Sequence, residues 1–185
     1  IVDPVASQTV CANASTAPVV FTTPTTGGTA VYNWTNDNTT IGLGASGTGN
    51  IPSFTGLNPT NGPNVANLTV TMIYTSGGIS CVSLPVSFTI TINPTPIVNP
   101  VANQVVCNGA PTAPVNFTSP TTGPTGALQF NWVNDNATIG LALSGTNSIP
   151  SFTAINSGVT PAVATIIVTP VYTNGGVTCT GASIT

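Results

Sequence analysis

Residues 85–93 read PVSFTITIN, and this stretch decides the fold class of the chain. Its apolar residues Val86, Phe88, Ile90 and Ile92 alternate with Ser, Thr and Asn. Because successive side chains of a β-strand point to opposite faces, the alternation predicts a strand with one buried face. The chain also carries 19 Gly and 17 Pro residues, which interrupt any long helical window. We therefore expect an all-β fold.

Further stretches alternate in the same way, and each has a counterpart in the second half of the chain. Their inward faces are expected to be Val19 and Phe21, matched by Val115 and Phe117; Ala30, Tyr32 and Trp34, matched by Leu128, Phe130 and Trp132; and Leu68, Val70, Met72 and Tyr74, matched by Ile166, Val168, Pro170 and Tyr172. The Gly-Gly pairs at 77–78 and 175–176 suit tight hairpin turns, because glycine readily adopts positive φ angles. About seven short strands in each half, with an early inward Trp and a late inward Tyr, are typical of an immunoglobulin-like β-sandwich.

The second half of the chain repeats the first. Residues 33–55 (NWTNDNTTIGLGASGTGNIPSFT) recur as residues 131–153 (NWVNDNATIGLALSGTNSIPSFT), with 17 of 23 positions identical. We expect a first immunoglobulin-like repeat at 1–93, a stiff Pro-containing linker at 94–96 and a second repeat at 97–185.

The second repeat is incomplete at its C-terminal end. Thr185 is the counterpart of Ser87, so no residues match the strand at 88–92. A sandwich without its last strand exposes a hydrophobic slot and unpaired backbone groups. We expect the slot to be filled either by continuation into another repeat or by a strand donated from a neighbour. Continuation is favoured because Ile1 aligns with Ile97 and leaves no spare strand, and both routes predict a linear assembly.

Charge is almost absent from this sequence. It has no Lys, Arg or His, and its only charged side chains are Asp3, Asp37 and Asp135. Nucleic-acid binding and electrostatic membrane binding both need basic residues, so neither is expected. Most acid–base catalysis needs a His, Lys or Glu that can titrate, so we expect no catalytic residues, no cofactor and no enzyme activity. No apolar run is long enough to span a bilayer, and the first residues do not combine a basic n-region with an apolar h-region.

The four cysteines fall two to each repeat. We expect Cys11 to pair with Cys81 and Cys107 with Cys179, which would tie down one end of each sandwich. Reactive thiols or metal ligation are the alternative. They are disfavoured because the chain has neither a CxxC pair nor a His. Disulfides imply an oxidising compartment outside the cytoplasm.

The Asn-Asp-Asn triplets around Asp37 and Asp135 allow two interpretations. Asp and Asn oxygens can bind Ca²⁺, but a single carboxylate at each site is a poor ligand set, so hydrogen bonding within a tight loop is favoured and no metal site is expected.

Trp34 and Trp132 could stack on sugars, yet their alternation with apolar neighbours points to the core. N-x-[ST] sequons occur at Asn13, Asn33, Asn38, Asn67, Asn116 and Asn136, of which only Asn38 and Asn136 are equivalent between repeats. These two are the candidate glycosylation sites, although sequons also arise by chance in so Asn- and Thr-rich a chain.

The run NW(T/V)NDN(T/A)TIGL, the later IPSFT and the closing FTITINPTP resemble PKD-like, immunoglobulin-like repeat domains, which occur in tandem in large secreted surface proteins of Bacteroidota. The resemblance covers both repeats. It implies an extracellular, type IX secreted structural module of a filament, stalk or fibre that works in extension and in cell-surface or biofilm adhesion. A ligand- or carbohydrate-binding adhesin module and an accessory domain of a larger secreted enzyme are the alternatives. The expected partners are further repeats or copies of the same chain, and covalent glycans are possible.

Overall fold

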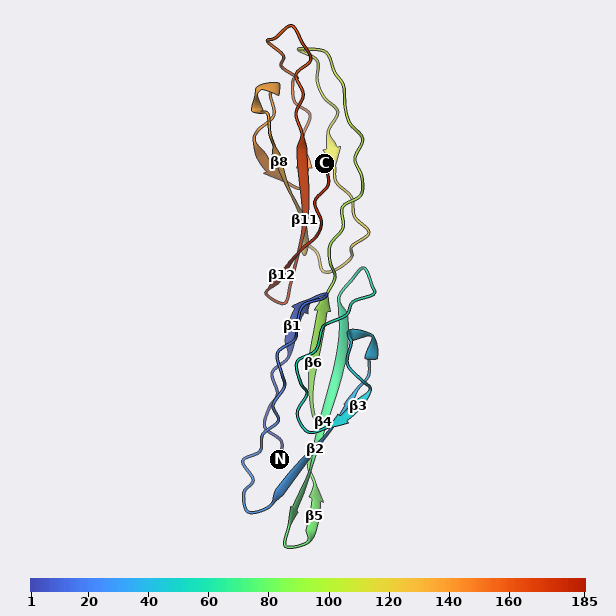
Figure 1. Ribbon diagram of the computed structural model, residues 1–185, viewed down its shortest axis with the longest axis vertical. Coiled ribbons are helices and arrows are strands. Elements are labelled where there is room, and N and C mark those ends of the chain that lie inside the picture. Colours follow the sequence, from blue (N-terminus) through green and yellow to red (C-terminus); the bar gives the residue numbers. More distant parts are fainter. The chain divides into compact units, whose positions relative to one another are not determined.

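The computed structural model describes all of residues 1–185, and the predicted all-β fold is confirmed. The chain divides into two compact units, drawn in Figure 1. The first comprises Ile1–Pro94 with Gly175–Val177, and the second comprises Thr95–Asn174 with Thr178–Thr185. The only helical segments are two three-residue 3₁₀ turns at Thr39–Ile41 and Ala137–Ile139. No helix in the structure has the length and apolar character needed to cross a membrane.

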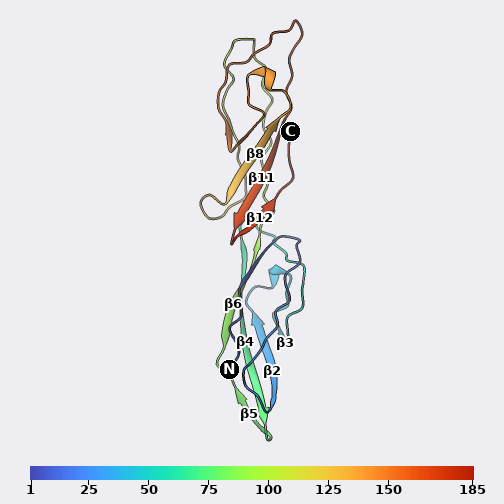
Figure 2. The same ribbon diagram turned by 90° about the vertical axis from the view of Figure 1, so that its left-hand side faces the viewer.

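Six strands of the first unit form a single sheet (Figures 1 and 2). They are β1 (Gln8–Cys11), β2 (Thr29–Asn36), β3 (Ser46–Thr48), β4 (Asn64–Ser76), β5 (Ile79–Val82) and β6 (Val86–Asn93). The strand order is β1-β6-β4-β2-β3, and β5 forms a hairpin with β4. Only the β1–β6 pair is parallel; it aligns Gln8 with Ile90 and Cys11 with Asn93.

The core of the first unit follows the predicted alternation. On β6, Phe88, Ile90 and Ile92 are buried, and on β4 the buried residues are Leu68, Val70 and Met72. Val19, Phe21 and Ile51 belong to the same buried cluster. The stretch around Val19 was expected to form a strand, but it makes only the isolated bridge Val19↔Ile51. The equivalent stretch of the second unit forms a two-residue strand at Val115–Asn116, although prolines flank it at the same positions, Pro114 and Pro120.

The second unit contains β7 (Val115–Asn116), β8 (Leu128–Asn134), β9 (Ser144–Thr146), β10 (Ser148–Ile149), β11 (Ile166–Asn174) and β12 (Val177–Thr180). They form a four-stranded sheet of order β12-β11-β8-β9 and a short β10-β7 pair. A separate core cluster includes Val98, Phe130, Trp132, Leu141, Ile149 and Val168. The expected inward faces of β8 and β11 are therefore confirmed at Phe130, Trp132 and Val168.

Both predicted hairpin turns are present. Gly77 and Gly78 have φ angles of 56° and 80°, and Gly175 and Gly176 have φ angles of 59° and 74°. Two consecutive positive φ angles are what a two-residue type I′ hairpin requires, and they favour glycine at both positions. The β4–β5 connection of the first unit thus has a close counterpart in the β11–β12 connection of the second.

Candidate functional site

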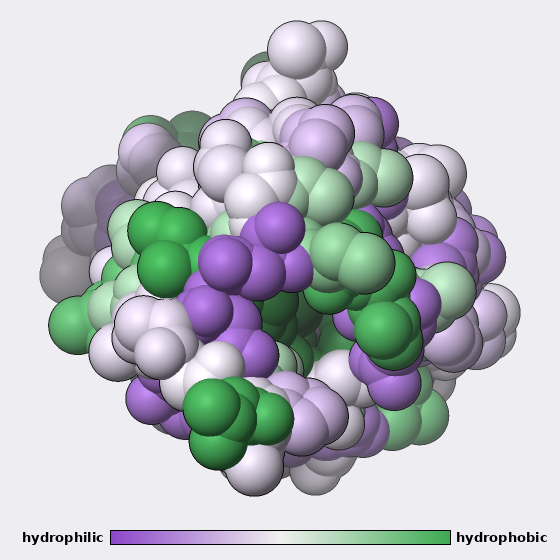
Figure 3. Space-filling model, turned by 90° about the horizontal axis from the view of Figure 1, so that it is seen from above, coloured by the Kyte–Doolittle hydropathy of each residue, from purple (hydrophilic) through white to green (hydrophobic).

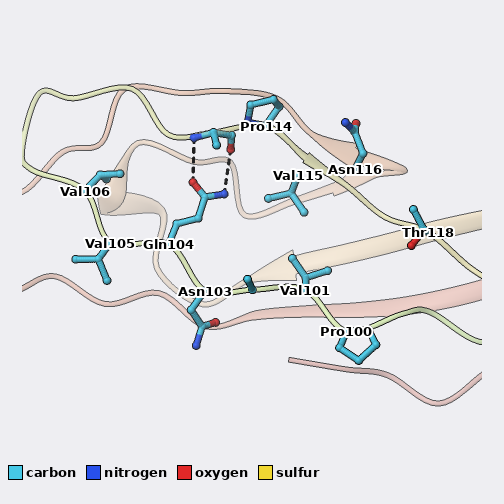
Figure 4. Close-up of a pocket in the computed structure, with 12 residues that line it drawn as sticks. Pro100, Val101, Asn103, Gln104, Val105, Val106, Pro114, Val115, Asn116 and Thr118 are labelled. Atoms are coloured by element: carbon cyan, nitrogen blue, oxygen red, sulfur yellow. Dashed lines mark hydrogen bonds between the residues drawn. The ribbon is translucent and has the colours of Figure 1, made fainter.

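An open groove with a volume of about 590 Å³ lies on the second unit (Figure 4). Residues 100–106 form one wall, and residues 113–116 with Thr118 form the other. Gln104 joins the two walls: its Nε2 donates to the Ala113 carbonyl at 3.0 Å, and its Oε1 accepts from the Ala113 N–H at 2.9 Å. Gln8 and Ala17 make the same pair of bonds in the first unit, at 3.1 and 2.9 Å. The Gln is therefore a structural clamp of each repeat.

The groove runs beside the segment that corresponds to β1. In the first unit β1 pairs with β6, and β6 in turn pairs with β4 from Val86 opposite Val70 to Ile92 opposite Asn64. In the second unit no strand occupies the place of β6, and the last residues make only the bridge Val168↔Ile184. Residues 104–107 consequently have no strand partner, and Val105 is 98% exposed.

Residues that β6 buries in the first unit have more exposed counterparts in the second unit. Ala66 and Leu68 are fully buried, whereas their counterparts Ala164 and Ile166 are only half-buried. Phe21 packs against Phe88 with ring centroids 6.2 Å apart, while its counterpart Phe117 contacts only Phe130 among the aromatic rings. Figure 3 looks along the long axis, and the hollow in this view is bordered by both hydrophobic (green) and hydrophilic (purple) side chains. The groove itself is lined by no charged side chain.

The cysteine pairing predicted from the sequence is wrong. Cys11 and Cys179 are the disulfide-bonded cysteines, and Cys81 and Cys107 are exposed free thiols. The β4 register explains why Cys11 cannot reach Cys81. Cys11 lies beside Asn93, level with the Asn64 end of β4, whereas Cys81 lies opposite Tyr74 on the same strand. Ten residues of strand span about 33 Å, far beyond the roughly 4.4–6.8 Å between the Cα atoms of a disulfide.

The second unit separates its two cysteines in the same way. Cys107 lies in a turn next to Gly109, whose N–H donates to Ala154. Ile155 follows Ala154 and donates to Ile139, just beyond the last residue of β8. Cys179 lies on β12 beside β11, and β11 ends near the first residues of β8. The two cysteines therefore lie at opposite ends of β8, and Cys107 cannot bond Cys179.

The Asn-Asp-Asn triplets fasten the loop that follows the Trp strand. In the first unit both carboxylate oxygens of Asp37 accept bonds from Asn67, one from the backbone N–H and one from the side-chain Nδ2, each at 2.7 Å. These two bonds, of which the one from the Asn67 side chain has the larger effect, hold the pKa of Asp37 below its usual value. Asp135 accepts from the Thr165 N–H at 2.7 Å in the second unit. Nowhere in the structure do three or more His, Cys, Asp or Glu side chains gather as metal ligands do.

The candidate glycosylation sites carry out a structural task in both repeats. Asn38 caps a 3₁₀ turn: its Oδ1 accepts from Thr40, and its Nδ2 donates to Asn64 at 2.8 Å and to Val65 at 2.9 Å. Asn136 caps the equivalent turn, and its Nδ2 donates to the Val163 carbonyl at 2.9 Å. An N-linked glycan would be attached to this same nitrogen. Its attachment would disturb bonds that hold the loop.

Trp34 and Trp132 lie in the two cores. They are 7% and 5% exposed, which leaves no ring face open for stacking on a sugar. The indole Nε1 of each is buried and has no hydrogen-bond partner. The core interpretation of these two residues is confirmed. No protein-family model matches the chain, and no curated protein matches it either.

Proposed function

We propose that this chain is a non-catalytic structural repeat module of an extracellular bacterial filament, stalk or fibre, acting in extension and cell-surface adhesion. The observation that carries the proposal is the repetition itself. The Trp strand, the capped Asn-Asp-Asn loop and the Gly-Gly hairpin are each built twice. In the second copy, the surface that β6 covers in the first is open.

A module that recurs in series needs a way to complete each open edge. Residues 104–107, which have no strand partner, and the half-buried Ala164 and Ile166 offer backbone groups and apolar side chains to an extended strand. A strand patterned like β6, with three apolar residues on one face, is the chemistry that fits. It would come from a following repeat or from another copy, and both give a linear assembly.

The surface composition supports an extracellular location and a structural task. A disulfide is present, and disulfides persist in oxidising compartments. With no basic residue and three Asp, the surface has little to offer anionic polymers. A carbohydrate-binding module has less support, because both Trp rings are buried and the Gln104 amide is bonded through both its nitrogen and its oxygen to Ala113.

Immunogold labelling tests the proposal directly. An antibody raised against this chain is applied to intact cells that produce it, with cells lacking the gene as the control, and the grids are examined by negative-stain electron microscopy. We expect gold along extended surface fibres with a regular axial repeat. Gold confined to the cytoplasm, or label on dispersed single particles in the medium, would reject the filament proposal.

A further inference from the structure

Three places in the sequence combine an Asn with a following Gly, the pair that most favours spontaneous loss of the side-chain amide. They are residues 61–62, 108–109 and 174–175. In this reaction the backbone nitrogen of the second residue attacks the side-chain carbonyl carbon of the Asn. Glycine has no Cβ to hinder the approach, and its backbone is conformationally permissive. The three pairs share the same covalent chemistry, so the fold decides which of them reacts.

Both reacting groups are occupied at Asn108. Its Oδ1 accepts from the Asn156 N–H at 2.9 Å, and the Gly109 N–H donates to the Ala154 carbonyl at 2.8 Å. These two hydrogen bonds must break before the nitrogen can attack the amide. Asn174 is half-buried at the end of β11 and takes part in an interaction of its own. The fold therefore hinders the reaction at both of these positions.

The third pair, Asn61 and Gly62, has neither restraint. Asn61 is exposed in the loop between β3 and β4, and neither its side chain nor the Gly62 N–H makes a hydrogen bond. Asn58 fixes the rest of the loop, because its Nδ2 donates to the Gly62 carbonyl and to the Ile92 carbonyl, both at 2.8 Å. Its Oδ1 accepts from the Thr60 N–H at 2.8 Å. The loop is thus held on both sides of an unbonded Asn-Gly peptide group.

The second repeat contains the same loop without the Asn-Gly pair. Asn156 makes the clamp there: its Nδ2 donates to the Thr160 carbonyl and its Oδ1 accepts from the Gly158 N–H, each at 2.9 Å. Val159 stands at the position of Asn61, and its side chain is fully exposed. The clamp therefore forms without an Asn at this position, so the loop does not need the Asn61 side chain in order to fold.

From these contrasts we propose that Asn61 is a site of spontaneous deamidation in the folded chain. The Gly62 nitrogen bonds to Cγ of Asn61, the bond from Cγ to Nδ2 breaks, and the amide leaves as ammonia with the proton from the Gly62 nitrogen. Water then opens the cyclic imide at one of its two carbonyls. One opening gives Asp, and the other gives isoaspartate, in which the main chain runs through the former side chain. Water is the only reactant added, so the reaction needs no enzyme.

The modification changes both the charge and the geometry of the loop. Either product adds a carboxylate to a chain whose formal net charge is −3. Isoaspartate also lengthens the main chain by one carbon between Asn58 and the Gly62 carbonyl that Asn58 holds. We expect the clamp to loosen, and the modified fraction to grow with the age of the chain. The inference goes beyond the proposed function and does not depend on it.

The test compares the folded chain with the chain unfolded in urea, both kept in a mildly alkaline buffer. Samples taken in series are digested with pepsin, since the chain has no Lys or Arg for trypsin, and mass spectrometry measures the deamidated fraction of each Asn-Gly peptide. In urea we expect the three pairs to react at similar rates. In the folded chain Asn61 should keep most of its rate, whereas Asn108 should be slowed roughly tenfold by its two hydrogen bonds.

Asn61→Val is the matched control, because the equivalent loop of the second repeat folds with Val159 at this position. On isoelectric focusing the unmodified chain should gain an acidic band with time, and the variant should gain it far more slowly. Isoaspartyl methyltransferase should label the aged unmodified chain and leave the aged variant nearly unlabelled. A rate at Asn61 in the folded chain as low as that at Asn108, or an acidic band that grows equally fast in the variant, would overturn the inference.

Discussion

Gly47 lies directly opposite Trp34 in the β2–β3 ladder, and a Cβ atom at position 47 would overlap the indole ring. Gly145 stands in the same relation to Trp132 in the second unit. Each Trp ring thus occupies the space beside a glycine on the neighbouring strand, where any side chain would collide with it. The pair is a packing unit of the repeat, present once in each core.

Substitution of Gly47 by Ala should destabilise the first unit by about 1–3 kcal/mol, because the added methyl group forces the buried ring to move. Gly44→Ala is the matched control: the nearest atom to a Cβ there is 3.9 Å away, so stability should change little. In a Trp132→Phe background, the fluorescence of Trp34 during urea unfolding reports the first unit alone. Equal midpoints for the two variants would contradict the packing argument.

The stability of the chain should be nearly constant between about pH 5 and pH 9 and fall on both sides of this range. The pKa of Asp37 is lower in the folded chain, because Asn67 donates to it from its side chain and its backbone. Its contribution is therefore fully present above the unfolded pKa of about 4 and is lost as the pH falls further. Burial raises the pKa of Tyr172, and burial together with the charge of Asp3 raises that of Tyr32. Those contributions are present below about pH 10 and are lost as the pH rises through the folded values.

Thermal melting followed by circular dichroism from pH 2 to pH 11 measures this profile, with the two free thiols alkylated beforehand so that they do not titrate. Asp37→Asn should flatten the acid limb of the curve. A steep loss of structure at neutral pH would show that a group other than these controls folding.

Asn38→Ala should lower the stability of the first unit by about 0.5–2 kcal/mol, the usual range for loss of a capping side chain. The side chain bonds Thr40 through its oxygen and Asn64 and Val65 through its nitrogen, so the variant loses the cap and two loop contacts together. Asn116→Ala is the control, since Asn116 is an exposed sequon residue on a two-residue strand. Urea unfolding of both variants checks the difference. An unchanged midpoint for Asn38→Ala would mean that the side chain is free for another task, such as carrying a glycan.

The fold class could be predicted because burial acts on one face of a strand at a time. Phe88, Ile90 and Ile92 are buried as a set, and the polar residues between them are free to vary. The cysteine pairing could not be predicted in this way. Sequence spacing does not show that β1 runs parallel to β6, and that pairing is what carries Cys11 to the end of the sheet away from Cys81. The exposed slot in the second repeat was visible in the sequence because one copy contains a strand that the other does not.

Extension of the chain after Thr185 by the β6 sequence FTITIN should stabilise the second unit. In the first unit the same residues place Phe88, Ile90 and Ile92 in the core, and burial of each such side chain contributes about 1.5–3 kcal/mol. The matched control is an extension of the same length in which these three residues are replaced by Ser. Hydrogen exchange read by mass spectrometry should show new protection of residues 104–107 and 162–168, the counterparts of the β1 and β4 stretches that pair with β6. Equal protection with both extensions would show that the open surface does not select an alternating apolar strand, and the assembly by strand completion would then have to be abandoned.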